Sequence, residues 1–149
     1  MSSGPYQLPI YRVSLVREGT LTTATATITS PEDAATILRE HLDGADREML
    51  VVLLLDVRNG VRGIHTASVG TLTESLVHPR EIFKAAIAGN AAAILLGHNH
   101  PSGDPEPSPE DLVTTRRLVE AGKTVGISVL DHVILGETGY VSLRERKQL

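Results

Sequence analysis

Two continuous apolar runs constrain the fold of this chain more than any other feature. MLVVLLLDV covers residues 49–57, and AAAILLG covers residues 91–97, directly before a pair of histidines. Apolar runs of this length, without alternating polar residues, are typical of strands that are covered on both faces of a sheet. A sheet of this kind needs helices above and below it, so the two runs predict a layered structure.

Helical and strand patterns alternate along the rest of the chain. Three helices are expected from apolar spacing and from prolines in the first turn, over residues 30–42, 78–90 and 109–121. Further strands are expected over residues 10–17, 61–70, 125–136 and 139–143. The turn RNG before residue 61 makes residues 61–70 a hairpin partner of the first apolar run. The predicted fold class is therefore α/β, with a mixed β-sheet between helices in an α-β-α sandwich.

The length of 149 residues predicts a single domain with a sizeable core. No linker-like stretch divides the chain, and the two copies of the tetrapeptide SPED diverge at once, so no internal duplication is indicated. The expected core covers about residues 28–145. Residues 1–27 are expected to form an N-terminal strand extension.

Composition excludes several classes of function. The net charge of −4 and the 3% aromatic content argue against independent binding to nucleic acid. The absence of cysteine excludes disulfides, a thiolate nucleophile and cysteine-ligated zinc. The start of the chain lacks a signal-peptide pattern, and no apolar run approaches membrane length, so a cytoplasmic protein without a membrane partner is expected.

The tetrapeptide SPED occurs at residues 30–33 and again at residues 108–111. Serine caps a helix N-terminus, proline suits the first helical position, and acidic residues favour the positive end of the helix dipole. This structural interpretation is sufficient for the first copy. It also applies to the second copy, where a chemical role is the added hypothesis.

The second copy follows His98 and His100, which end the second apolar run. Residues i and i+2 of a strand point to the same face, so the two imidazoles are expected side by side at the sheet edge. Asn99 should point the other way. A proline-rich loop, residues 101–107, then leads to Asp111 in the first turn of a helix, where the dipole favours the ionised carboxylate.

Two imidazoles and one carboxylate form a suitable ligand set for zinc, with a fourth position open to water. The same set also describes the facial triad of non-haem iron oxygenases. A third interpretation is that the histidines are solvated loop residues. The residue types alone leave these alternatives open.

The order His98-x-His100, seven residues, then Ser108-x-x-Asp111 resembles the JAMM signature of the JAB/MPN metalloprotease superfamily. More closely, HNHPSGD, PSPED and LDHVILG resemble the bacterial RadC family, from about Glu48 to Leu143. The resemblance implies a JAB/MPN fold, similar to that of cytidine deaminases. Members often carry a helix-hairpin-helix segment ahead of this domain, whereas the residues before Glu48 are expected to form a strand and a helix, so the chain resembles the short form of the family.

The resemblance also implies roles for individual residues. His98, His100 and Asp111 would hold one zinc ion per chain, and Ser108 would steady the tetrahedral intermediate. Glu48 would be the general base. Its rivals as the base are the carboxylates Glu40, Glu74 and Glu81. For Asp131 and His132 a buried structural role is expected, with a place at the groove as the alternative.

The function implied is that of a zinc-dependent metallopeptidase or isopeptidase, in which metal-activated water attacks an amide carbonyl of a protein or peptide. The alternative is a non-catalytic accessory protein of DNA repair or mobile elements with a structural metal site. The sequence indicates neither the physiological substrate nor the oligomeric state.

Overall fold

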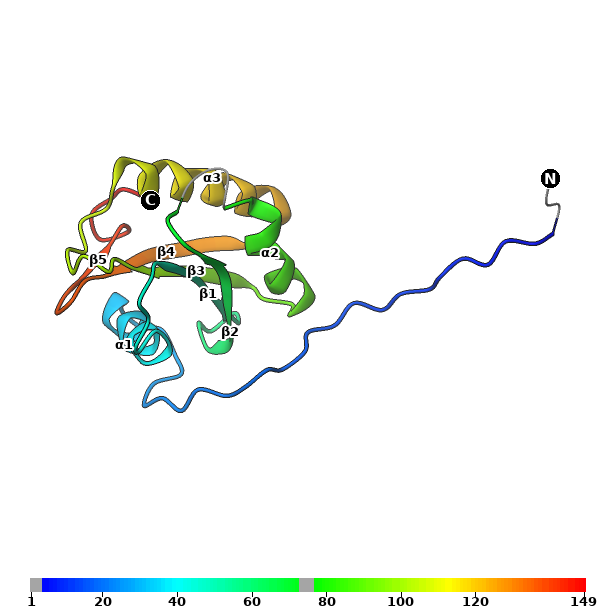
Figure 1. Ribbon diagram of the computed structural model, residues 1–149, viewed down its shortest axis with the longest axis horizontal. Helices are drawn as coiled ribbons and strands as arrows, with labels where there is room; N and C mark the ends of the chain where they lie inside the picture. Colours follow the sequence, from blue (N-terminus) through cyan, green and yellow to red (C-terminus); the bar gives the residue numbers. More distant parts are fainter. Residues whose placement is uncertain (1–3, 73–76) are drawn as a thin grey trace.

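A computed structural model describes residues 4–72 and 77–149, and within them a single five-stranded sheet lies between helices (Figure 1). The strands are β1 (Met49–Leu55), β2 (Val61–Val69), β3 (Ala93–Asn99), β4 (Ser128–Leu135) and β5 (Tyr140–Ser142). The helices are α1 (Pro31–His41), α2 (Pro79–Ala88) and α3 (Pro109–Val125). The strand order is β2-β1-β3-β4-β5.

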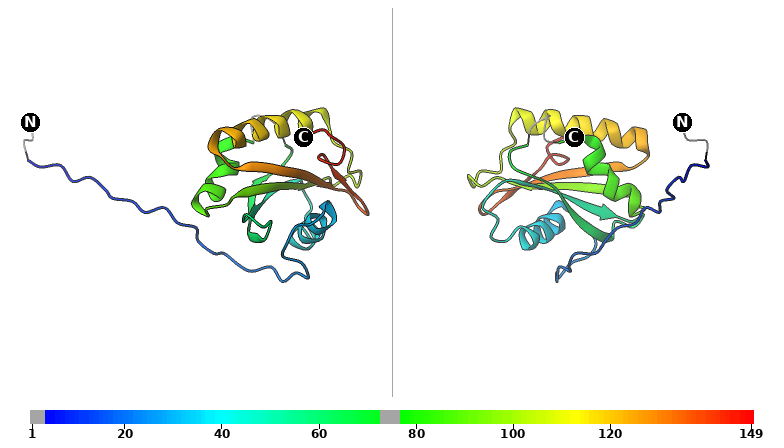
Figure 2. Two further views of the ribbon diagram at one scale, coloured as in Figure 1. Left: turned by 180° about the vertical axis from the view of Figure 1, so that it is seen from behind. Right: turned by 45° about the vertical axis from the view of Figure 1, so that its right-hand side comes forward.

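The sheet is mixed, because β3 and β4 are parallel whereas the other neighbouring pairs are antiparallel. Helix α1 covers one face, and α2 and α3 lie together on the other, as both views in Figure 2 show. The predicted α/β class with a mixed sheet between two helical layers is confirmed.

Strand β1 explains why its sequence is apolar without alternation. Its side chains are buried on both faces of the sheet, and successive residues belong to different cores. The core under α2 and α3 takes Leu50, Val52 and Leu54 from β1, and Ile94 and Leu96 from β3. The core under α1 takes Val51, Leu53 and Leu55, with Ala93 and Leu95.

Helix α3 is longer than predicted. It was expected to end at Ala121, before a glycine, but it continues for another turn to Val125. Glycine is needed at position 122 because an added Cβ would overlap the backbone carbonyl oxygen of Ile127 and would lie 3.2 Å from Cζ of Phe83. The helix ends at Gly126, whose φ of 80° is the left-handed conformation that glycine adopts without strain.

The strand expected over residues 10–17 is wrong, and the strand extension predicted for residues 1–27 is wrong over the part that the structure describes. The described residues up to Val13 run extended away from the body, with Ile10 97% exposed (Figure 1), whereas Leu21 packs against the core under α1. A strand needs a partner for its N–H and C=O groups, and within the described residues the segment makes a single bridge, Thr27 to Gly60. The alternating apolar residues predicted a strand, but the pattern does not show whether another strand is available to pair with it.

Among residues 4–72 and 77–149, no helix combines the length and the apolar character needed to cross a bilayer.

Candidate metal centre

Strand β3 carries the two histidines to the carboxyl end of the sheet. His98 continues the row formed by Ile94 and Leu96, so its imidazole faces α3 and is fully buried. His100 lies just beyond the strand, where its backbone N–H donates to the Leu135 carbonyl at 2.9 Å. The two imidazoles lie side by side, with ring centroids 4.7 Å apart.

Helix α3 brings Asp111 to the same place through its capping box. The Asp111 N–H donates to Oγ of Ser108 at 3.1 Å, and the Ser108 N–H donates to Oδ2 of Asp111 at 2.8 Å. The first SPED copy uses its acid in a similar way, since Asp33 Oδ2 accepts from the N–H groups of Thr29 and Ser30. Only the second copy has imidazoles beside its carboxylate.

Four side chains converge at this point: Glu48, His98, His100 and Asp111 each offer one ligand atom, and these atoms all lie within 4.8 Å of one another. The two Nε2 atoms are 2.9 Å apart. Asp111 places Oδ1 3.5 Å from Nε2 of His98 and Oδ2 3.1 Å from Nε2 of His100. Ligands at zinc distances in a tetrahedron are separated by roughly 3.3 Å, so the three groups fit around one such ion.

The orientation of His100 agrees with this fit. Its Nδ1 lies 2.8 Å from the carbonyl oxygen of Asp104. A carbonyl can only accept, so Nδ1 carries the proton and donates. In the neutral imidazole the other nitrogen, Nε2, then has a lone pair, and this lone pair faces the centre of the cluster. A metal ion requires this arrangement.

Glu48 lies beside the histidines because β1 runs antiparallel to β3. Leu50 is the partner of His98 in that ladder, and Glu48 precedes it on the same face. Its Oε1 is 3.3 Å from Nε2 of His98 and 3.8 Å from Nε2 of His100.

Two of the three rival carboxylates lie on helices outside this cluster. Glu40 is exposed on α1, and Glu81 pairs with Lys84 at 2.8 Å on α2. Glu74 lies outside the described residues.

Asn99 holds the backbone on both sides of Glu48, a role that the sequence analysis missed. Its Oδ1 accepts from the Met49 N–H at 2.8 Å, and its Nδ2 donates to the Arg47 carbonyl at 3.0 Å. The expectation that Asn99 points away from the histidines is confirmed. The sequence could have indicated only that Asn99, between two histidines of one strand, lies on the opposite face of the sheet. Its contacts with the start of β1 depend on the pairing of β1 with β3.

The pKa values of the two carboxylates are shifted in opposite directions. Burial alone would raise the pKa of Asp111, but the hydrogen bond and charge of His98 and the N–H of Ser108 outweigh it and hold the pKa well below its usual range. Burial raises the pKa of Glu48, and His98 and His100 offset this only in part. Asp111 is therefore the firmly ionised acid, and Glu48 is the better proton acceptor.

Asp131 and His132 are both buried, as expected. Asp131 accepts from the Ser142 hydroxyl at 2.6 Å and from the Arg144 N–H at 3.0 Å, so it ties β4 to the end of the chain. His132 has its Nε2 2.6 Å from Nδ1 of His98, so it touches the cluster as well as the core. Burial, followed by the charge of His98, lowers its pKa, which keeps this imidazole neutral.

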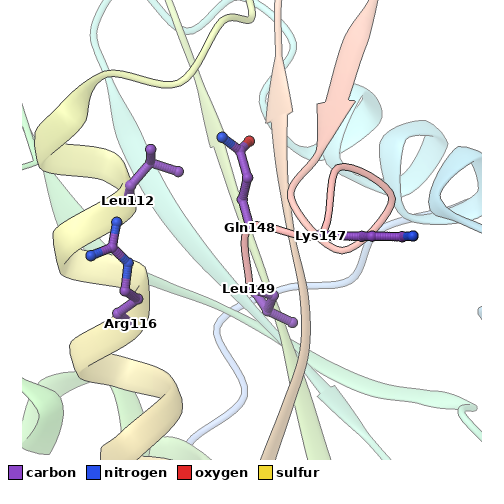
Figure 3. Close-up of a pocket in the computed structure, with 5 residues that line it drawn as sticks. All are labelled: Leu112, Arg116, Lys147, Gln148 and Leu149. Carbon is purple, nitrogen blue, oxygen red and sulfur yellow. The ribbon is translucent and has the colours of Figure 1, made fainter.

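Two hollows of the described surface lie near these elements. One, of about 530 Å³, reaches His100 and is bordered by the end of α1, residues 101–103 and residues 135–137. The other, of about 320 Å³, lies between α3 and the chain end, and Figure 3 shows Leu112, Arg116, Lys147, Gln148 and Leu149 around it. Only the first is lined by a member of the cluster.

Comparison with known proteins identifies the relatives of this chain. Residues 28–148 match the family model described as the RadC-like JAB domain. The chain is 52% identical over 119 residues to a UPF0758 protein of Caldanaerobacter subterraneus subsp. tengcongensis, covering 80% of this chain and 51% of that protein. It is 55% identical over 119 residues to a UPF0758 protein of Desulfitobacterium hafniense, covering 80% and 52%.

A UPF0758 protein of Moorella thermoacetica is 50% identical over 133 residues, which cover 89% of this chain and 58% of that protein. The chain thus spans about half the length of the curated relatives it matches.

Proposed function

The chain belongs to the RadC-like JAB domain family, and on this basis we propose that it is a zinc-dependent hydrolase of the JAMM class that cleaves an amide bond in a protein or peptide. The observation that carries the proposal is the convergence of two imidazole nitrogens and the Asp111 carboxylate, with a second carboxylate, Glu48, alongside. This arrangement contains a ligand set and a base in one site.

In this proposal His98, His100 and Asp111 hold the ion. A zinc ion bound by three protein groups supplies a Lewis acid that polarises a carbonyl and lowers the pKa of water to about 7. The ionised state of Asp111 supports its assignment as a ligand, because the carboxylate needs no deprotonation before it binds.

Glu48 is assigned the proton transfers. It accepts the proton of the attacking water and donates it to the leaving amine, so that a single carboxylate serves as base and then as acid. Its raised pKa supports this role, since a carboxylate of higher pKa is a stronger base and a readier acid near neutral pH. Its Oε1, 3.3 Å from Nε2 of His98, is close enough to contact water beside the ligands.

Ser108 is assigned the stabilisation of the developing oxyanion. Its oxygen accepts the Asp111 N–H, which holds the side chain in place at the helix start. The hydroxyl keeps its own proton and can donate it to the substrate oxygen. One such donor is worth about 2.7–4 kcal/mol of transition-state stabilisation in other hydrolases.

The hollow beside His100 is the proposed place for the substrate chain. It is bordered by residues 101–103 and by Gly136 and Glu137. A protein or peptide substrate could lie there with a peptide carbonyl next to His100.

Metal analysis of the purified protein tests the proposal. We expect close to one zinc per chain, and His98→Ala and Asp111→Ala should lose it while keeping a native circular dichroism spectrum. Asp33→Ala is the matched control, because it alters the first SPED copy and should retain zinc. Iron held in preference to zinc under anaerobic conditions would contradict the assignment.

Glu48→Gln separates the proposed enzyme from its alternative. The variant should keep zinc and lose amide hydrolysis, which can be measured on a library of peptides and isopeptide-linked conjugates. Loss of zinc in Glu48→Gln would instead make Glu48 a fourth ligand. That result would favour a non-catalytic accessory protein with a structural metal site.

A further inference from the structure

A buried row of hydrogen bonds lies behind His98, on the side away from the cluster. Nδ1 of His98 is 2.6 Å from Nε2 of His132, and Nδ1 of His132 is 2.6 Å from Oγ1 of Thr115. The Thr115 hydroxyl is also 2.7 Å from the carbonyl oxygen of Asp111, one helical turn earlier on α3. All three side chains in the row are almost completely buried, so water does not replace these contacts.

The direction of the row follows from its last member. The Asp111 carbonyl can only accept, so the Thr115 hydroxyl donates its single proton there. The Thr115 oxygen must then accept from His132, which places the His132 proton on Nδ1. Neutral His132 has its lone pair on Nε2, and that nitrogen accepts a proton from Nδ1–H of His98.

We propose that Thr115 and His132 are positioning residues that fix His98 in the tautomer with its proton on Nδ1, so that its Nε2 lone pair faces the cluster. The proposal rests on the metal site proposed above. The row starts at the backbone of Asp111 and ends at His98, so it joins two of the three ligands from behind. It also explains why a polar imidazole and a threonine occupy the core between β4 and α3.

The opposite direction of the row has an identifiable cost. If Thr115 donated to His132, the proton of His132 would move to Nε2 and that of His98 would also lie on Nε2, where it would block a metal ion. The Asp111 carbonyl would then lose the Thr115 hydrogen bond. The 2.7 Å bond from Thr115 to Asp111 is therefore the contact that selects the binding-competent tautomer.

The first test uses the metal-free protein. Long-range ¹H–¹⁵N NMR spectra of the histidine rings should give the proton on Nδ1 for both His98 and His132. Thr115→Val should shift both rings toward a mixture of tautomers. The matched control is Thr114→Val, since the Thr114 hydroxyl is buried and has no hydrogen-bond partner among residues 4–72 and 77–149. That control should leave both tautomers unchanged.

The second test measures zinc affinity by chelator competition. Mutation of a group that orients a metal ligand typically lowers the affinity for the metal by about 10–100-fold. We expect a loss of that size for Thr115→Val and for His132→Phe, with the fold checked by circular dichroism. His132→Gln should recover part of the loss, because its amide oxygen can accept from His98. Thr114→Val should bind zinc as the wild type does.

Two results would overturn the proposal: a wild-type His98 with its proton on Nε2, or unchanged zinc affinity in a folded Thr115→Val and a folded His132→Phe. Failure of the proposed function is a separate outcome. A wild-type protein that binds no zinc would contradict the metal site, whereas the NMR spectra of the metal-free protein would still decide the tautomer of His98.

Discussion

Asn99 stabilises the site through both its backbone and its side chain. Its backbone continues β3 between the two histidines, while its amide replaces the missing ladder bonds at the entry to β1. The Gly70 N–H donates to the Glu48 carbonyl at 2.6 Å from the other side. The backbone around Glu48 is thus fixed by contacts to two neighbouring segments, although the Glu48 side chain remains 16% exposed.

Replacing Asn99 with alanine should release the backbone around Glu48 without removing a ligand. Hydrogen exchange at the Met49 amide should become faster, because its acceptor is lost. A misplacement of about 1 Å can cost about 10²-fold in rate, so amide hydrolysis should fall by roughly 10–10²-fold while the zinc content stays at the wild-type level. Equal losses of zinc and activity would mean that Asn99 acts through the histidines.

Asp33 offers a pH-dependent test of the first SPED copy. Hydrogen bonds from Thr29 lower its pKa below the ordinary 3.8. A lowered folded-state pKa stabilises the protein above the unfolded value, and this stabilisation is lost as the pH falls through the folded value. Asp33→Asn should therefore cost about 0.5 kcal/mol at pH 7, low in the capping range because the group is exposed.

Below pH 3.8 the two proteins should converge in urea unfolding. A difference that grows on acidification would contradict the assigned direction of the pKa shift.

At the scale of elements, β3 combines a packing surface and a chemical surface in one strand. The face with Ile94 and Leu96 ends in His98, whereas the other face carries Leu95 and Gly97 and ends in Asn99. An added Cβ at Gly97 would overlap the fully buried side chain of Leu38 on α1. The glycine therefore lets α1 pack close to the strand directly behind the candidate ligands.

Gly97→Ala should destabilise the protein by about 1–3 kcal/mol, the usual cost of overpacking a core, as measured by urea unfolding. Gly139→Ala is the control, because a Cβ there would meet no atom within 4 Å. Equal stabilities of the two variants would show that Leu38 can move aside without cost.

Some helices and strands could be predicted from the sequence, and others could not. The buried strands and the helix starts depend on local patterns, so β1, β3 and the capping boxes were predictable. The strand over residues 10–17 was not, because pairing depends on a partner elsewhere in the chain. The contact of His132 with His98 could not be predicted either, because it depends on the register of the parallel strands β3 and β4, in which His132 pairs with Leu96.

At the scale of the whole molecule, the candidate centre lies where three elements meet, at the end of the sheet to which the carboxyl end of β3 points. β3 ends there, α3 begins there, and antiparallel β1 enters there. Open α/β sheets commonly bind ligands beyond the carboxyl ends of their strands. The two apolar cores contain none of the four converging side chains, so most of the packing that stabilises the fold comes from other residues.

Residues 4–13 belong to neither core and should contribute little to stability. Their large side chains are mostly exposed, including Tyr6 at 88% and Val13 at 79%. Deleting residues 2–13 should therefore change the free energy of unfolding by no more than about 0.5 kcal/mol. Ile28 is the contrasting position, because it packs against the core under α1 and its N–H donates to the Asn59 carbonyl at 2.9 Å.

Ile28→Ala should cost about 1–2 kcal/mol, less than at a fully buried site, because its side chain is only partly covered. Urea unfolding of both proteins at two concentrations distinguishes the roles of the two segments. If the deletion costs more than Ile28→Ala, and the cost grows with protein concentration, then the exposed apolar side chains of residues 6–16 pack on a second molecule. A small cost that is independent of concentration would leave the body of the fold, from Ile28 onward, as the part that supports the site.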